Sequence, residues 1–294
     1  MLIKRKRCLR AFGDYVAAYD PADPKIALKI AHTYRVADLC EGIALDEGMC
    51  AEDVDVAWLC GLLHDIGRFE QVRRYGTFSD ARSVSHAALG VSVLLDEGRL
   101  WDFVDGGETA GGGGAFGCRV EDGEGGGAEP FNSPVDLLPR GEAGEFAGFI
   151  ATVIGTHSDY RLPQGLDART REFCDILRDA DKVDILKAVG EADVSQVIDY
   201  PMDVILASDI SPNVQAAFCE HRTLLRAERS TPADMLVSYA CFLFEMSHTH
   251  ALRAASDQGY VWRLLATPFA NPHTAQVAAE MAIHLREWVD ERVR

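Results

Sequence analysis

The sequence lacks most of the features that mark secreted, membrane-spanning or nucleic-acid-binding proteins. It has no Cys-x-x-Cys pair, and its 8 cysteines are scattered, which is typical of a reducing compartment rather than of a disulfide scaffold. No apolar run approaches the roughly 18 residues that a membrane span needs. No apolar stretch follows the basic residues near the start, so we expect no signal peptide. These absences predict a cytoplasmic protein without a membrane partner.

Cationic side chains are fewer than acidic ones. Lys and Arg number 29 against 46 Asp and Glu, which gives a formal net charge of −17. The electrostatic field of a chain with this net negative charge repels polyanions, so we expect no nucleic-acid polymer as a partner. A small phosphorylated substrate is still compatible with this charge, because a bound metal ion can dominate the local field.

Strand-like alternation and internal repeats are absent as well, whereas apolar residues recur at helical spacing through most of the chain. We therefore predict an all-α fold, organised as one domain over residues 1–294. Residues 69–80, which are rich in arginine and aromatic side chains, are predicted to form a polar loop. The expected helices span residues 25–47, 51–65, 83–95, 142–156, 168–189, 212–228, 232–250 and 273–292.

Residues 105–134 differ from the rest of the chain. They are rich in glycine and acidic side chains and contain few large apolar ones. Such a composition cannot offset the entropy cost of ordering the chain. Because candidate site residues lie on both sides of this segment, we interpret it as a flexible insertion within a domain. A tolerated surface insertion is the favoured interpretation, and a mobile lid is the alternative.

The strongest chemical signal is an apolar helix that ends in His64-Asp65. Two adjacent side chains that can both ligate a metal are unusual at the end of a buried helix, and the Gly that follows, Gly67, is expected to stop the helix. Neighbouring helical residues project about 100° apart, so both side chains can reach one cavity. The other candidate ligands also fall on predicted helices or at their ends. They are His32, His86, His157 and Asp181.

The acidic residues of this set strengthen the metal hypothesis. Burying an ionised Asp without a partner is costly, and both Asp65 and Asp181 have strongly apolar neighbours. A bound metal ion would account for both. The competing explanation is a set of buried salt bridges to Arg35, Arg68 or Lys182, which accounts for them less economically.

The order His32, His64-Asp65 and Asp181 resembles the HD-domain superfamily of metal-dependent phosphohydrolases. The resemblance covers roughly residues 25–190, apart from the insertion. It implies an HD-type helical bundle, with additional C-terminal helices over about 191–294. Three segments carry it: His32-Thr-Tyr-Arg-Val, Leu62-Leu-His-Asp-Ile-Gly-Arg-Phe-Glu-Gln71 and Arg178-Asp-Ala-Asp-Lys-Val-Asp-Ile185.

Two further histidines, His86 and His157, fall where the two-metal subset of the superfamily carries extra ligands. That subset includes the HD-GYP phosphodiesterases, although this chain has no Gly-Tyr-Pro signature. The resemblance implies that His86 and His157 hold a second metal ion and that Asp65 bridges the two ions. It assigns the first ion to His32, His64 and Asp181. His-carboxylate ligation suits Fe, Mn, Zn or Ni, and the sequence does not choose among these divalent metals.

The chemistry implied by such a site is hydrolysis of a phosphoester. Two divalent ions lower the pKa of a bridging water, so the expected reaction is attack of a metal-activated hydroxide on phosphorus, with Asp65 as a catalytic ligand. Arg68 is the favoured phosphate contact, Lys182 is the second choice and Arg35 the third. The expected substrate is a nucleotide or another small phosphorylated molecule. The oligomeric state is left open, with a homodimer as one option.

Two other functions stay open at this point. The same six ligands around two irons support oxygenase chemistry in the myo-inositol oxygenase branch of the superfamily. Some HD relatives that have lost their ligands act only as signalling modules, and the complete ligand set counts against that alternative here. His248 and His250, in Met246-Ser-His-Thr-His, resemble a metal pair, but they lie outside the HD region and lack the spacing of helical ligands.

Overall fold

The computed structural model describes residues 3–105, 141–192, 195 and 198–294. These residues are mostly helical, and within them extended pairing is limited to a bridge between Ile3 and Val104. The prediction of an all-α fold is therefore confirmed. The predicted insertion at 105–134 lies, from residue 106 onward, outside the described residues. Among the described helices, none combines the length and apolarity that are needed to cross a bilayer.

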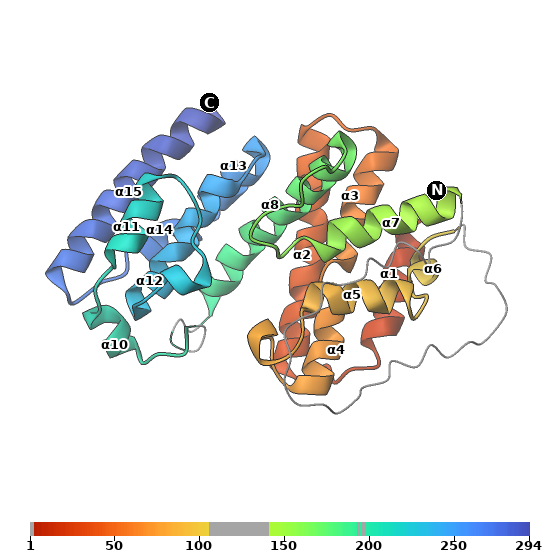
Figure 1. Ribbon diagram of the computed structural model, residues 1–294, viewed down its shortest axis with the longest axis horizontal. Helices are drawn as coiled ribbons and strands as arrows, with labels where there is room; N and C mark the ends of the chain where they lie inside the picture. The colour runs from red at the N-terminus through yellow and green to blue at the C-terminus, as the bar shows by residue number, and fades with distance from the viewer. Residues whose placement is uncertain (1–2, 106–140, 193–194, 196–197) are drawn as a thin grey trace. The chain divides into compact units, whose positions relative to one another are not determined.

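The chain divides into two compact units. The first unit comprises Met1–Lys29 and Leu63–Thr156, and the second comprises Ile30–Leu62 and His157–Arg294. In the first unit, α5 packs against both α4 and α7 (Figure 1). The helices of the first unit are α1 (Arg5–Val16), α4 (Ile66–Tyr75), α5 (His86–Leu95), α6 (Leu100–Phe103) and α7 (Glu142–Gly155), with a 3₁₀ turn, η1, at Asp80–Arg82.

Aromatic packing holds the N-terminal helix of the first unit against α4. Phe12 of α1 and Phe69 of α4 are both fully buried, and their rings meet edge to face with centroids 5.9 Å apart. Tyr19 closes the cluster, and its hydroxyl donates a hydrogen bond of 2.6 Å to the buried carboxylate of Glu70. Burial of such rings is a large stabilising contribution, so this cluster attaches α4 firmly to α1.

Two helices, α2 and α3, precede the His64-Asp65 pair in the chain. α2 (Pro24–Asp46) ends before Gly48, whose φ of 69° is a left-handed conformation that glycine adopts without strain. α3 (Ala51–Leu63) carries Glu52 and Asp53 in its first turn, where negative charge favours the helix. From Val54 onward nearly every residue of α3 is buried. α3 is therefore a rigid support for the pair that follows it.

The segment after Asp65 differs from its prediction. Residues 69–80 are predicted to form a loop, but a new helix, α4, starts at Ile66 and continues to Tyr75. Its charged residues support it, because Glu70 forms ion pairs with Arg73 and Arg74 three and four residues later. Phe69 and Val72 of the same helix are buried. The polar composition of this segment thus reflects an amphipathic helix rather than a loop.

Gly67 has a different role from the predicted one. It does not stop a helix; it lies in the first turn of α4, where α4 crosses α5. A Cβ at this position would overlap the carbonyl oxygen of His86 and the backbone nitrogen of Gly90. Glycine is therefore required for the close approach of two backbones. α4 ends before Gly76, whose φ of 66° is the left-handed conformation that commonly terminates a helix.

The second unit is arranged around α8 (Ala168–Glu191). Asp167 caps this helix by accepting a hydrogen bond from the backbone N–H of Thr170. The buried residues of α8 include apolar side chains and three charged ones, Arg178, Asp179 and Asp184. The C-terminal helices are α10 (Met202–Ala207), α11 (Pro212–Cys219), α12 (Pro232–Val237), α13 (Thr249–Asp257), α14 (Tyr260–Leu265) and α15 (Pro272–Val293), with 3₁₀ segments η3 (Arg226–Glu228) and η4 (Ser238–Glu245).

Two of the predicted C-terminal helices are shorter than expected. The helix predicted at 212–228 ends at Cys219, and the one predicted at 232–250 is divided into α12, η4 and α13. The break between η4 and α13 has a tertiary cause. The carboxylate of Asp179 accepts hydrogen bonds of 2.8 Å and 3.0 Å from the backbone N–H groups of Ser247 and His248. This contact favours an extended chain where the local pattern favours a helix.

Candidate metal centre

His64 and Asp65 form the bend between α3 and α4, and both are almost completely buried. One carboxylate oxygen of Asp65, Oδ2, lies 3.4 Å from Nε2 of His64. The other, Oδ1, lies 3.5 Å from Nε2 of His86. Asp65 therefore turns each of its two oxygens toward a different imidazole, which is the arrangement that a bridging carboxylate requires.

His86 lies in the first turn of α5, whose N-terminus is capped by Ser85. Its Nδ1 is 2.7 Å from Oδ2 of Asp80. Because an ionised carboxylate can only accept a hydrogen bond, Nδ1 is the donor to Asp80, and Nε2 is the ring nitrogen that faces Asp65. Burial opposes ionisation of Asp80, but the hydrogen bond and charge of His86 hold the pKa of Asp80 well below its usual range. Asp80 thus orients His86 as a ligand.

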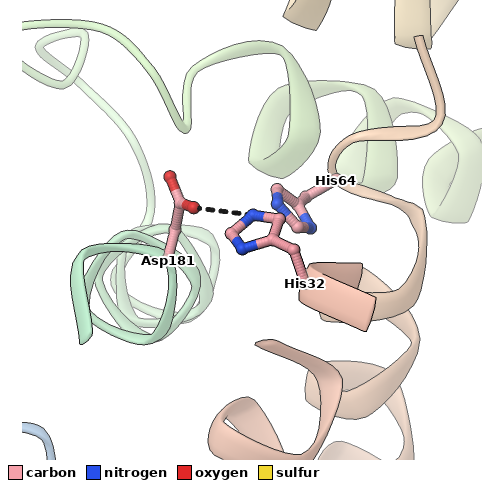
Figure 2. Close-up of side chains that lie close together, drawn as sticks. All are labelled: His32, His64 and Asp181. Carbon is pink, nitrogen blue, oxygen red and sulfur yellow. Dashed lines mark ion pairs between the residues drawn. The ribbon is translucent and has the colours of Figure 1, made fainter. Parts of the chain in front are cut away.

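His32 is oriented in the same way within the second unit. Its Nδ1 is 2.6 Å from Oδ2 of Asp184, and its Nε2 is 3.2 Å from Oδ1 of Asp181. Figure 2 shows Asp181 on α8 and His32 on α2 pointing toward one another, with His64 beside them. Asp181 and Asp184 are three residues apart on α8, so both face α2.

Arg35 completes this part of the arrangement. Its Nε and Nη2 donate hydrogen bonds of 2.5 Å and 2.9 Å to the two oxygens of Asp184. Burial raises the pKa of Asp184, yet the hydrogen bonds from His32 and Arg35 outweigh it and lower that pKa overall. Arg35 is expected from the sequence to line the pocket, and the structure places its guanidinium on Asp184.

The six residues predicted as ligands gather in two groups. His32, His64 and Asp181 form one, and Asp65, His86 and His157 form the other; within each group the potential ligand atoms lie within 4.8 Å of one another. His157 follows α7, and its carbonyl oxygen accepts a hydrogen bond of 3.4 Å from Nη1 of Arg178.

The residues present fit a divalent metal ion. Each group offers two imidazoles and one carboxylate, a donor set that suits Fe, Mn, Zn or Ni. In both groups one histidine, His32 or His86, has a carboxylate behind its Nδ1, which is the support that metal-binding histidines usually have. Five of the six side chains are buried, and Asp181 is partly exposed. That these six residues ligate metal remains a prediction.

The predicted phosphate contacts have different surroundings. Arg68 lies on α4 with its Nε 3.5 Å from Oδ1 of Asp65. That Nε is buried and has no hydrogen-bond partner among the described residues. Its N–H is therefore available to donate a hydrogen bond to a ligand beside Asp65. Lys182 follows Asp181 on α8, but its Nζ lies 3.6 Å from Oε2 of Glu245, and burial lowers its pKa. The structure therefore supports Arg68 more strongly than Lys182 for this role.

Sequence reasoning missed three residues of this arrangement. Asp184 had a signal, because it follows Asp181 by three positions on a predicted helix. Asp80 had none, since it falls in a segment predicted as loop. Lys29 was also missed; its Nζ is 2.5 Å from Oδ2 of Asp65. This contact joins residues 36 positions apart, which no local spacing predicts.

His248 and His250 lie apart from both groups. Nδ1 of His248 is 2.8 Å from Oδ2 of Asp179, and its Nε2 is 3.2 Å from Oε1 of Glu172. Both His248 and Asp179 are buried. Burial by itself would lower the pKa of His248, but the hydrogen bonds and charges of Asp179 and Glu172 raise it to about 9. His248 is therefore a charged link between α8 and the start of α13.

His248→Ala is expected to destabilise the protein by about 3 kcal/mol near pH 6, because it leaves the Asp179 carboxylate buried without its cation. The raised pKa sets the pH dependence: the stabilisation is fully present below 6.5, the ordinary value, and is lost as the pH rises through about 9. Urea unfolding at pH 6 and pH 10 checks this result. The difference between wild type and variant should shrink at pH 10, whereas the exposed control His273→Ala should change little at either pH. An equal difference at both pH values would contradict a charged His248.

Comparison with known families gives one match. The family model of the HD domain matches residues 30–110, which include His32, His64, Asp65 and His86. No curated protein and no solved structure matches the chain. The matched range begins within α2 and contains α3, α4 and α5, the elements that carry these four residues. Residues 30–110 therefore resemble the HD domain of metal-dependent phosphohydrolases, and divalent-metal binding is the property that this similarity implies.

Proposed function

We propose that this protein is a metal-dependent phosphohydrolase that cleaves a phosphoester of a nucleotide or another small phosphorylated molecule. The observation that carries the proposal is the pair of buried groups, each with two imidazoles and one carboxylate, in a chain whose residues 30–110 resemble the HD domain. His32, His64 and Asp181 would hold one divalent ion, and His86 and His157 a second, with Asp65 shared. Ions bound there would lower the pKa of a water molecule and neutralise negative charge on the phosphoryl group.

The protein's own residues have defined tasks in this proposal. Asp80 and Asp184 hold His86 and His32 with Nε2 available for ligation. Arg68 presents its Nε, which faces Oδ1 of Asp65 at 3.5 Å without a hydrogen-bond partner among the described residues, at a position where a phosphoryl oxygen can accept from it. The Nη1 of the same guanidinium donates to Gln71, the carbonyl of Phe78 and Asp80, so the direction of Nε is set before a substrate binds.

Metal analysis combined with a phosphatase screen tests this function. The purified protein is analysed for bound metals, stripped with a chelator and assayed for phosphate release from nucleotides, dinucleotides and sugar phosphates after reloading with Mn, Fe, Zn or Ni. We expect about two ions per chain and hydrolysis that is lost on stripping and restored by at least one metal. Turnover that consumes dioxygen without releasing phosphate would instead identify an oxygenase and contradict the proposal.

A further inference from the structure

Lys29 lies in direct contact with the carboxylate that both metal-binding groups turn toward. It is on α2, and its Nζ is 2.5 Å from Oδ2 of Asp65. Its side chain is only 16% exposed, whereas Lys25, one turn earlier on the same helix, is exposed and donates to the carbonyl of Gly76. Lys29 is thus a largely buried ammonium held against Asp65.

A second cation meets the other oxygen of the same carboxylate. Nε of Arg68 faces Oδ1 of Asp65 at 3.5 Å and has no hydrogen-bond partner among the described residues. The ammonium of Lys29 and this N–H therefore converge on Asp65 from α2 and α4. One carboxylate thus has two largely buried cationic side chains beside it.

The aromatic ring of Phe78 lies beside both cations. Nζ of Lys29 lies 5.6 Å from the ring centroid, and the guanidinium carbon of Arg68 lies 5.7 Å from it. Such contacts between a cation and an aromatic ring are attractive and tolerate desolvation. The backbone carbonyl of Phe78 also accepts a hydrogen bond of 2.7 Å from Nη1 of Arg68. Phe78 therefore contacts both cations.

We propose that Lys29 is a second phosphate-binding residue of this site, acting beside Arg68 on the same phosphoryl group; the inference rests on the proposed function. When Asp65 ligates metal ions, its negative charge is shared with them, and a buried ammonium beside it needs another anion. A phosphoryl group carries up to two negative charges and three acceptor oxygens, which match the ammonium of Lys29 and the Nε of Arg68.

A purely structural role makes a different prediction. If Lys29 served only to neutralise Asp65, its removal would alter stability and metal affinity and leave phosphate binding to the loaded protein unchanged. If it binds phosphate, the same change weakens phosphate binding, and a different cation at this position restores part of it. Inorganic phosphate is a suitable probe, because it requires no knowledge of the substrate.

The test compares Lys29→Met and Lys29→Arg with wild type, with Lys25→Met as the matched control on the same helix. Titration calorimetry measures binding of Mn²⁺ to the stripped proteins and of inorganic phosphate to the loaded proteins. We expect Lys29→Met to weaken phosphate binding roughly 10- to 100-fold. Its Mn²⁺ affinity should be unchanged or tighter, because a cation next to Asp65 is gone. Lys29→Arg should retain most of the phosphate affinity, and Lys25→Met should match wild type.

The outcomes separate this inference from the proposed function. If wild-type protein binds phosphate and hydrolyses phosphoesters while Lys29→Met binds phosphate equally well, only the role of Lys29 is overturned. If loaded wild-type protein neither binds phosphate nor hydrolyses any phosphoester, both are overturned. A loss of phosphate affinity in Lys29→Met that Lys29→Arg restores supports the proposal even if the Met variant is less stable.

Discussion

Asp65→Asn is expected to lower phosphoester hydrolysis by a factor on the order of 10³ or more and to reduce the metal content of the purified protein. The physical reason lies in the two contacts of the carboxylate. Its oxygens face Nε2 of His64 at 3.4 Å and Nε2 of His86 at 3.5 Å, so one side chain serves both groups of potential ligands. An amide keeps the shape of the side chain, but it has no negative charge and only one acceptor oxygen.

The matched control for this substitution is Asp102→Asn. Asp102 makes the same change of carboxylate to amide at a half-exposed position of the first unit, where its side-chain partner is Arg99 at 3.4 Å. It should leave both hydrolysis and metal content as in wild type. Activity is measured as phosphate release under metal-saturating conditions, and metal content by elemental analysis. If Asp65→Asn keeps full activity and both ions, Asp65 is not a ligand and the proposed site is wrong.

Gly67→Ala is expected to destabilise the protein by about 3 kcal/mol or more, although it adds only one methyl group. The added carbon would overlap the carbonyl oxygen of His86 and the backbone nitrogen of Gly90. Both are backbone atoms of α5, so no flexible side chain can move aside. The clash forces α4 and α5 apart, which also separates Asp65 from His86. Hydrolysis should therefore fall together with stability.

Gly13→Ala provides the control for this prediction. Gly13 lies inside α1, and a Cβ there would meet no atom within 4 Å. Because alanine favours a helix interior over glycine, this substitution should raise stability by about 0.5–1 kcal/mol. Guanidinium chloride unfolding of both variants gives the two free energies. Equal and small effects in the two variants would mean that α4 and α5 do not approach each other closely at Gly67.

Local patterns predicted most of the helices because each depends on residues close in the sequence. The helices expected at 25–47, 142–156 and 168–189 correspond to α2, α7 and α8 within a few residues. Local patterns failed where a distant partner decides the conformation. The carboxylate of Asp179 accepts hydrogen bonds from the backbone N–H groups of Ser247 and His248, and this contact interrupts a predicted helix. α4 was missed because its polar surface was interpreted as a loop.

The sequence by itself determined the helical class and the resemblance of residues 30–110 to the HD domain, and it was enough to propose six ligand residues. Burying a histidine or aspartate among apolar helical residues costs free energy unless the side chain has a partner. The sequence alone shows which of these residues lie among apolar neighbours. The tertiary structure decided which residues support them. It brought Asp184 to His32, Asp80 to His86, and Lys29 with Arg68 to Asp65. These contacts join residues from separate helices, and no local spacing encodes how helices pack.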